Sequence, residues 1–253
     1  MEALLMDKLT IKQLCANLRL SELSIAFEEQ YRESAYKNMA FEDRLRELLQ
    51  VQYDADNVKR RARMGQQANL RWSDATIEDC FKRHIEHRRL LADILMEFDW
   101  VGRNENIVIT GKTGVGKTHL ACAIANAAMN KGITVLFKRF YNLLLELVAA
   151  ENEMNLKRFR NKLNRTNIVI LDDWGLAPLC DRERHLLFEF IESRECKASL
   201  IITSQYDTKD WYGAFQDHTL ADSVLDRIVS YAHVIKLEGD SARCIAREGG
   251  DNE

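Results

Sequence analysis

The chain has 253 residues, of which 46% are hydrophobic and 30% are charged, and its formal net charge is −3 at pH 7. That composition excludes a disordered chain, because it supplies enough apolar side chains for a buried core. Without an overall positive charge, any binding to nucleic acid would depend on local basic patches. Apolar runs such as 143–150 are far shorter than the ~18 residues needed to cross a membrane, and no signal peptide is evident. We therefore expect a cytoplasmic protein with no membrane partner.

The cysteines do not suggest a metal or disulfide framework. Six of them are scattered along the chain without a Cys-x-x-Cys pair. Cys80, His84 and His87 could share one helical face, but no fourth ligand lies nearby in the sequence, so ordinary thiols are favoured over a metal site.

The first part of the chain is predicted to be helical. The chain has only one proline and 11 glycines, which favours helix throughout. Apolar residues recur at helical spacing in 11–18 and 45–53. We expect an all-helical N-terminal domain over residues 1–72 and a larger domain over 73–253, in which 73–103 form a linker helix.

The second part contains short apolar runs that predict strands. Helical stretches such as 119–130 and 184–193 separate these runs. Such alternation indicates an α/β fold, in which helices cover a five-stranded parallel sheet on both faces. The predicted strands are 107–110, 134–137, 168–171, 200–203 and 234–237.

A complete phosphate-binding loop follows the first of these strands. Residues 111–118 read GKTGVGKT, which matches G-x-x-x-x-G-K-[ST], and an apolar helix follows. Its glycines allow successive backbone N–H groups to face phosphates, and the helix adds its positive dipole end. We expect Lys117 to reach the β- and γ-phosphates of ATP and the Thr118 hydroxyl to bind Mg²⁺. The predicted loop contacts are Gly111, Lys112, Thr113, Gly114, Val115, Gly116, Lys117 and Thr118.

Polar residues at two further strand ends complete the predicted site. Asp172 is placed to hold Mg²⁺, and Asp173 to orient or deprotonate the attacking water. The alternative for Asp173 is a simple cap. After the next strand, Ser204 and Gln205 could hold the water or the γ-phosphate, although a polar turn explains them equally well.

These segments together resemble one family of ATPases. NIVITGKTGVGKTHLACAIANAA, NIVILDDWGLAPL, SLIITSQY and LADSVLDRIVSYAHVIKLEGDSAR are similar to AAA+ proteins of the initiator clade, which includes DnaA, DnaC and IstB. The resemblance covers nearly the whole chain. It is strongest to the IstB family, bacterial ATPases encoded beside the transposase of insertion sequences.

The resemblance implies roles for individual residues. Lys117 and Thr118 become the Walker A pair, and Asp172 and Asp173 the Walker B pair. Gln205 falls at the first-sensor position, and His119 joins the nucleotide contacts. Arg227 falls at the position of an arginine finger that enters the site of a neighbouring subunit, which implies a homo-oligomer. The alternative for Arg227 is a surface salt bridge.

Two departures from the AAA+ pattern stand out. Walker B ends in Asp-Asp instead of Asp-Glu, which leaves open whether Asp173 activates water. Only 26 residues follow Arg227, too few for a C-terminal lid domain, so none is expected. Arg243 is a weak candidate for a replacement phosphate contact.

Basic residues cluster in three places with few acidic neighbours. Each could neutralise a phosphate of duplex DNA without reading its sequence, although solvated helix faces are the plain alternative. By the resemblance, the N-terminal helices bind DNA or a partner. The clusters are Lys59, Arg60, Arg61, Arg63 and Arg71; Lys82, Arg83, Arg88 and Arg89; and Lys157, Arg158, Arg160, Lys162 and Arg165.

The expected function is that of an ATP-dependent, DNA-binding ATPase. It would assemble as an oligomer on duplex DNA and help the transposase of the same insertion sequence, through selection or remodelling of target DNA. A DnaC-like helicase loader is the main alternative. A small-molecule phosphotransferase and a nucleotide-gated module with negligible turnover are further ones.

Overall fold

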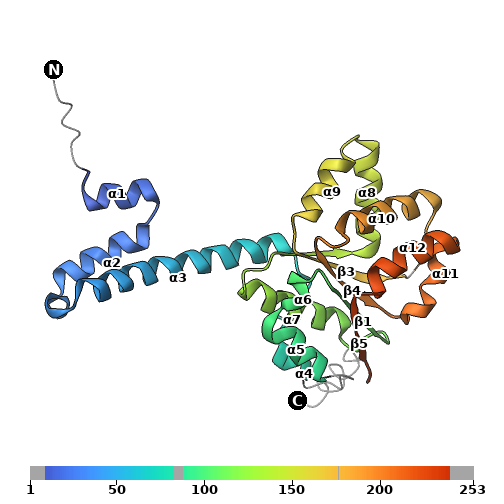
Figure 1. The fold of residues 1–253 in the computed structure, drawn as a ribbon, viewed down its shortest axis with the longest axis horizontal. Coiled ribbons are helices and arrows are strands. Elements are labelled where there is room, and N and C mark those ends of the chain that lie inside the picture. The colour runs from blue at the N-terminus through green and yellow to red at the C-terminus, as the bar shows by residue number, and fades with distance from the viewer. Residues whose placement is uncertain (1–8, 82–87, 176, 240–253) are drawn as a thin grey trace, which may run out of the picture. The chain divides into compact units, whose positions relative to one another are not determined.

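A computed structural model describes the chain except residues 1–8, 82–87, 176 and 240–253 (Figure 1). Its contacts divide into two compact units, Met1–Arg63 and Met64–Glu253, which are described separately. No helix among the described residues is long and apolar enough to cross a membrane. Several residues considered in the sequence analysis lie outside the described residues, namely Lys82, Arg83, His84, His87 and Arg243, as do the side chains of Arg88 and Arg89.

The first unit is helical. A buried glutamine of its longest helix, Gln52, caps another helix, because its Oε1 accepts hydrogen bonds of 3.1 Å from the backbone N–H of Glu22 and of Leu23. Such a cap satisfies N–H groups that have no partner within their own helix. The elements are α1 (Ile11–Leu18), α2 (Ser21–Arg32), the 3₁₀ helix η1 (Ser34–Asn38) and α3 (Phe41–Ala68).

The last residues of α3 belong to the second unit. Met64 and Ala68 are buried among its core residues, so the contacts divide at Arg63. The domain boundary at residue 72 stays a prediction. Residues 73–103 are expected to form a linker helix, and the described part of this stretch contains α4 (Ile77–Phe81), α5 (Arg88–Glu97) and α6 (Asp99–Gly102). The linker helix stays a prediction.

The second unit is built on a five-stranded parallel sheet, which confirms the predicted fold class. The strand order is β2-β3-β4-β1-β5, so β4 lies between β3 and β1. The carboxyl ends of these three strands therefore meet at one edge, where parallel sheets commonly bind ligands. The strands are β1 (Asn106–Gly111), β2 (Val135–Arg139), β3 (Ile168–Trp174), β4 (Ser199–Ser204) and β5 (Ala232–Leu237).

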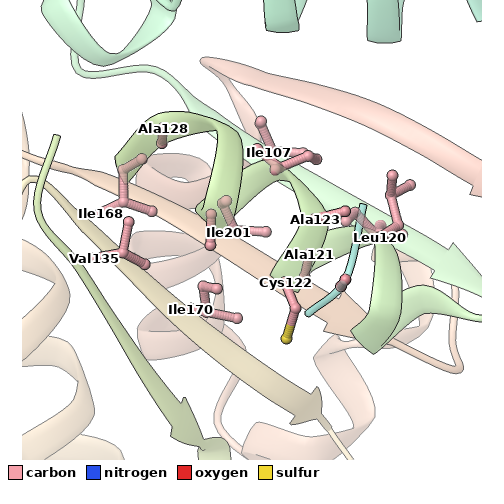
Figure 2. Packing of buried hydrophobic residues seen from close by; sticks show 14 of the residues in the cluster. Ile107, Leu120, Ala121, Cys122, Ala123, Ala128, Val135, Ile168, Ile170 and Ile201 are labelled. Atoms are coloured by element: carbon pink, nitrogen blue, oxygen red, sulfur yellow. The ribbon is translucent and has the colours of Figure 1, made fainter. Parts of the chain in front are cut away.

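Alternating strand residues build two apolar layers, one on each face of the sheet. Ile107 and Ile109 belong to the same buried cluster as residues of α7, and Figure 2 shows Ile107 together with Leu120, Ala121 and Ala123 of that helix. Val108 joins the opposite layer, which contains residues of α8, α10 and α12. The helices and turns that follow β1 are α7 (Lys117–Asn130), α8 (Phe140–Asn152), α9 (Leu156–Asn164), α10 (Asp181–Arg194), η2 (Thr208–Asp210), α11 (Tyr212–Phe215) and α12 (His218–Val229).

A buried arginine joins α9 to the sheet. The Arg194 guanidinium is 1% exposed and donates to the carbonyls of Leu163, Thr166 and Ser199 at 2.8, 3.1 and 2.9 Å. Desolvation lowers the pKa of Arg194 to about 10, so it remains charged at neutral pH. Its hydrogen bonds connect the end of α9 to the beginnings of β3 and β4.

Gly111 lies where the backbone of β1 closely approaches that of β5. A Cβ atom on Gly111 would lie 2.3 Å from the carbonyl oxygen of Leu237, and its φ of +146° is one that side-chain-bearing residues rarely adopt. The phosphate loop can therefore leave the sheet here only from a glycine.

We predict that Gly111→Ala lowers the free energy of unfolding by at least ~2 kcal/mol, because the clash involves backbone that cannot move aside. Gly102→Ala is the matched control, since nothing lies within 4 Å of its added Cβ. That control should stay within ~0.5 kcal/mol of the wild type in urea unfolding. Equal losses in both variants would contradict the close approach.

Candidate functional site

The predicted phosphate loop connects β1 to α7. Gly114 and Gly116 have φ angles of +87° and +101°, which only glycine adopts without strain. The Lys117 ammonium is almost fully buried and donates to the carbonyl oxygens of Gly111 and Lys112 at 2.7 and 2.9 Å. The loop backbone itself thus orients the lysine predicted to reach the phosphates.

The Asp172 carboxylate lies at the centre of the site. It is fully buried at the end of β3, and its Oδ1 accepts two hydrogen bonds. One comes from the Thr118 hydroxyl of α7 at 2.7 Å and the other from the Thr203 hydroxyl of β4 at 2.6 Å. The structure therefore brings Thr118 and Asp172 together as predicted and adds Thr203, which the sequence interpretation missed.

The second carboxylate oxygen of Asp172 has a different environment. Among the described residues, Oδ2 has no hydrogen-bond donor, and a guanidinium nitrogen of Arg71 lies 3.8 Å from it. Burial raises the pKa of Asp172 above its ordinary value of 3.8, while the hydrogen bonds from Thr203 and Thr118 offset part of that increase. Burial of the charged Asp172 carboxylate therefore lowers the free energy of unfolding.

These oxygens fit Mg²⁺. The ion prefers hard oxygen ligands, and Thr118 Oγ1 and Asp172 Oδ2 supply them next to the phosphate loop. An unpartnered buried carboxylate oxygen is also the group that a cation would satisfy. Thr118 and Asp172 would hold the metal, in agreement with the roles expected from the sequence.

A bulge in β3 redirects Asp173. The register between β3 and β4 shifts between Leu171 and Trp174, and Asp173 has a φ of +63°. Its backbone N–H donates to the Thr203 hydroxyl at 3.1 Å. In a regular strand Asp172 and Asp173 would face opposite sides, so the bulge allows both to serve one site.

Asp173 and the predicted metal ligand Asp172 both line a cavity of about 290 Å³. Arg139, Asn142, Pro178 and Glu183 are among its other lining residues. The half-buried carboxylate of Asp173 is therefore accessible to water, as its predicted role requires.

The end of β4 contacts the phosphate loop through Gln205. Its Oε1 accepts a hydrogen bond of 2.7 Å from the Thr113 hydroxyl, so this candidate sensor lies against the loop. Ser204 instead has a structural role, because it is buried and its hydroxyl donates to the Trp174 carbonyl and accepts from Trp211 Nε1.

His119 lies on the first turn of α7, beside residues that precede the sheet. Its ring centroid is 6.2 Å from that of Trp72, and its Nδ1 is 3.5 Å from the Cys80 sulfur. His119 therefore connects the phosphate loop to the segment that follows α3.

Arg227 is engaged within its own chain. Its Nε lies 2.8 Å from a carboxylate oxygen of Glu195, and a terminal nitrogen donates to the Ser223 carbonyl at 2.7 Å. The guanidinium also lies 5.4 Å from the ring centroid of Phe188. To act as a finger for another subunit, Arg227 would first have to leave Glu195.

The expected DNA-binding residues separate into three environments. Lys59, Arg60 and Arg63 of α3 are exposed and Arg61 is half-buried, and Lys59 forms an ion pair with Glu22. On α9, Lys157, Arg158 and Lys162 are exposed, whereas Arg160 binds Glu189 at 2.6 Å. Arg71 lies 3.8 Å from Asp172, a predicted metal ligand, and its contact with DNA stays a prediction.

Comparison with protein families matches residues 13–249 to the family described as IstB-like ATP binding protein. The chain belongs to this family. This IstB-like chain is 33% identical over 231 residues to an insertion sequence ATP-binding protein of Sinorhizobium fredii (strain NBRC 101917 / NGR234), covering 91% of the chain and 93% of the relative. A similar protein of Pseudomonas fluorescens is 37% identical over 203 residues, covering 79% of the chain and 87% of the relative.

The fold of the IstB-like chain also has counterparts among solved structures. The crystal structure of the DnaC helicase loader superposes with a TM-score of 0.54 at 22% identity, covering 66% of this chain and 99% of that one. This likeness concerns the fold. Together with the family match, it confirms the resemblance seen in the motifs.

We predict that Asp172→Asn stabilises the protein by ~1 kcal/mol at pH 7, since it removes a buried charge and keeps the oxygen that both hydroxyls bind. Because folding raises the pKa of Asp172, the wild-type carboxyl lowers the free energy of unfolding as the pH rises from 3.8 through its pKa in the folded protein. The difference between the two proteins should therefore disappear below about pH 3.8. Urea unfolding at several pH values measures it, and a less stable variant at pH 7 would contradict the burial argument.

Proposed function

We propose that this IstB-like protein hydrolyses ATP with Mg²⁺ at the site around Asp172. The observation that supports this most strongly is the meeting of three strand ends and the phosphate loop at one buried carboxylate. Thr118 and Asp172 offer metal ligands, and Lys117 lies at the loop where the phosphates would bind. Membership of a family of ATP-binding proteins supports the nucleotide.

The residues can be assigned to steps of hydrolysis. Backbone N–H groups of the loop and Lys117 bind the phosphates, and bound Mg²⁺ supplies charge stabilisation on their oxygens. Asp173 orients a water molecule and accepts its proton as the water oxygen bonds to the γ-phosphorus and the bond to the β-phosphate oxygen breaks. Gln205, bound to Thr113, lies at the loop where it can orient the γ-phosphate.

We further propose that the active form is a homo-oligomer. Phosphoryl transfer is strongly accelerated by an arginine from outside the phosphate loop. Arg227 lies at the end of α12, and its ion pair with Glu195 holds it within its own subunit. Assembly would exchange the Glu195 carboxylate for the γ-phosphate of a neighbour.

The DNA partner is proposed from the basic residues. Lys157, Arg158 and Lys162 are exposed on α9, and no ion pair is found for them among the described residues. Apolar residues such as Leu163 anchor the other side of this helix in the core. The exposed side would contact phosphates of duplex DNA regardless of its sequence, and a ring of subunits would multiply this binding.

The transposase of the same element is the proposed protein partner. The two curated relatives are named as insertion sequence ATP-binding proteins, which favours transposition over the loading of a helicase. Capture of purified transposase by the full chain, with a replicative helicase as the competitor, tests this choice. Preferential capture of the helicase would overturn it.

We predict that Lys117→Ala weakens ATP binding by roughly tenfold or more, the equivalent of one charge-assisted hydrogen bond. ATP-dependent assembly on duplex DNA should then be lost, as measured by analytical ultracentrifugation. Lys112→Ala is the control, because the Lys112 side chain is exposed and only its backbone carbonyl contacts Lys117. Assembly of Lys117→Ala at the wild-type ATP concentration would refute the nucleotide dependence.

For the finger, we predict that Arg227→Ala lowers ATP turnover by ~10³-fold without weakening ATP binding. Mixing Arg227→Ala with Lys117→Ala subunits should restore part of the turnover, because one subunit then supplies the lysine and the other the arginine. Glu195→Gln should keep turnover at or above the wild-type rate, since it weakens the ion pair that retains Arg227. A mixture as inactive as its components would exclude a finger acting between subunits.

A further inference from the structure

We infer that Arg71 is a positioning residue of the metal site. Its positive charge makes the binding of a divalent cation at Asp172 depend on bound nucleotide. The inference rests on the proposed function, because it concerns the Mg²⁺ that ATP hydrolysis requires. It assigns Arg71, expected from the sequence to contact DNA, to a different role.

The first observation is the charge arrangement at Asp172. Both hydroxyl donors, Thr118 and Thr203, bind its Oδ1. Its Oδ2 receives no hydrogen bond from the described residues and faces Arg71 at 3.8 Å. That separation is too long for a hydrogen bond, so Arg71 balances the carboxylate by charge and leaves the oxygen available as a ligand.

The second observation is how firmly the Arg71 backbone is fixed to α7. The backbone of Trp72 and Arg71 lies beside the sulfur of Cys122, a buried residue of α7. One turn further along α7, Asn126 donates to the carbonyls of Ser73 and Ala75 at 3.1 and 2.9 Å. The segment that bears Arg71 is thus attached to the helix that begins with the phosphate-binding lysine and the metal-binding threonine.

Two cations then compete for one carboxylate. A guanidinium and a divalent ion near the same oxygen repel each other, and the site is buried enough for that repulsion to be strong. Arg71 therefore balances Asp172 without metal and weakens the affinity of the site for metal alone. The negative phosphates of ATP raise the affinity for the divalent ion, because they attract it. Their oxygens can also accept hydrogen bonds from the partly exposed guanidinium of Arg71.

The test measures metal binding without turnover. Mn²⁺ replaces Mg²⁺, and electron paramagnetic resonance counts free Mn²⁺ in the presence of the full-length chain. For Arg71→Gln we expect ~10-fold tighter Mn²⁺ binding than the wild type without nucleotide. With the non-hydrolysable analogue AMPPCP the two proteins should differ less, and Arg71→Lys should resemble the wild type because it keeps the charge.

Control variants separate this role from others. Arg165→Gln removes an exposed arginine next to α9 and should leave Mn²⁺ binding unchanged. Arg71→Gln combined with Asp172→Asn should lose the gain, since the shared ligand is gone. Should Arg71→Gln fail to fold, Arg71→Met keeps the apolar stem and tests the same charge.

The outcomes are distinct. Unchanged or weaker Mn²⁺ binding in folded Arg71→Gln, or an equal gain with and without AMPPCP, would overturn the inference. If Arg71 only contacted DNA, Arg71→Gln would lose DNA binding and would not bind Mn²⁺ more tightly. A wild type that hydrolyses no ATP, with Mn²⁺ still tighter in Arg71→Gln, would refute the proposed function and keep this inference.

Discussion

The proposed nucleotide site of this protein depends on one buried negative charge. A carboxylate without water must be satisfied by donors and cations, and at Asp172 these come from elements far apart in the sequence. Thr118 comes from α7, Thr203 from β4 and Arg71 from the segment after α3. The strand order places β4 between β3 and β1, which allows a single residue to receive all three. Moving any one of these elements would remove one of the partners that offset the buried charge.

Thr203 has a second role at the Asp-Asp pair of β3. Its hydroxyl donates to Asp172 and accepts from the backbone N–H of Asp173, so it holds both sides of the bulge. With the strand bent in this way, Asp173 already lies beside a cavity at the site. The local backbone therefore contributes to the position of the second carboxylate, which is one way in which a short side chain can occupy the place of a longer one.

The sequence predicted much of this arrangement, because its signals are local. The phosphate loop, five strands and the Walker pair each follow from residues adjacent in the chain. Thr203 was missed because it reads as one more residue of a buried strand. Arg71 was assigned from charge and Arg227 from the family resemblance, and neither reveals a carboxylate brought close by folding. The bulge was equally unpredictable, since it depends on the register between two strands.

The hydrogen bonds of Arg194 have a mechanical consequence for the basic helix α9. They attach its end to the beginnings of β3 and β4, at the opposite pole of the sheet from the nucleotide. A load applied to α9 by a bound polymer would therefore pass along the full length of two strands before it reached Asp172 and Thr203. Because parallel strands resist stretching better than loops do, the sheet would transmit a force from α9 to the proposed nucleotide site with little deformation.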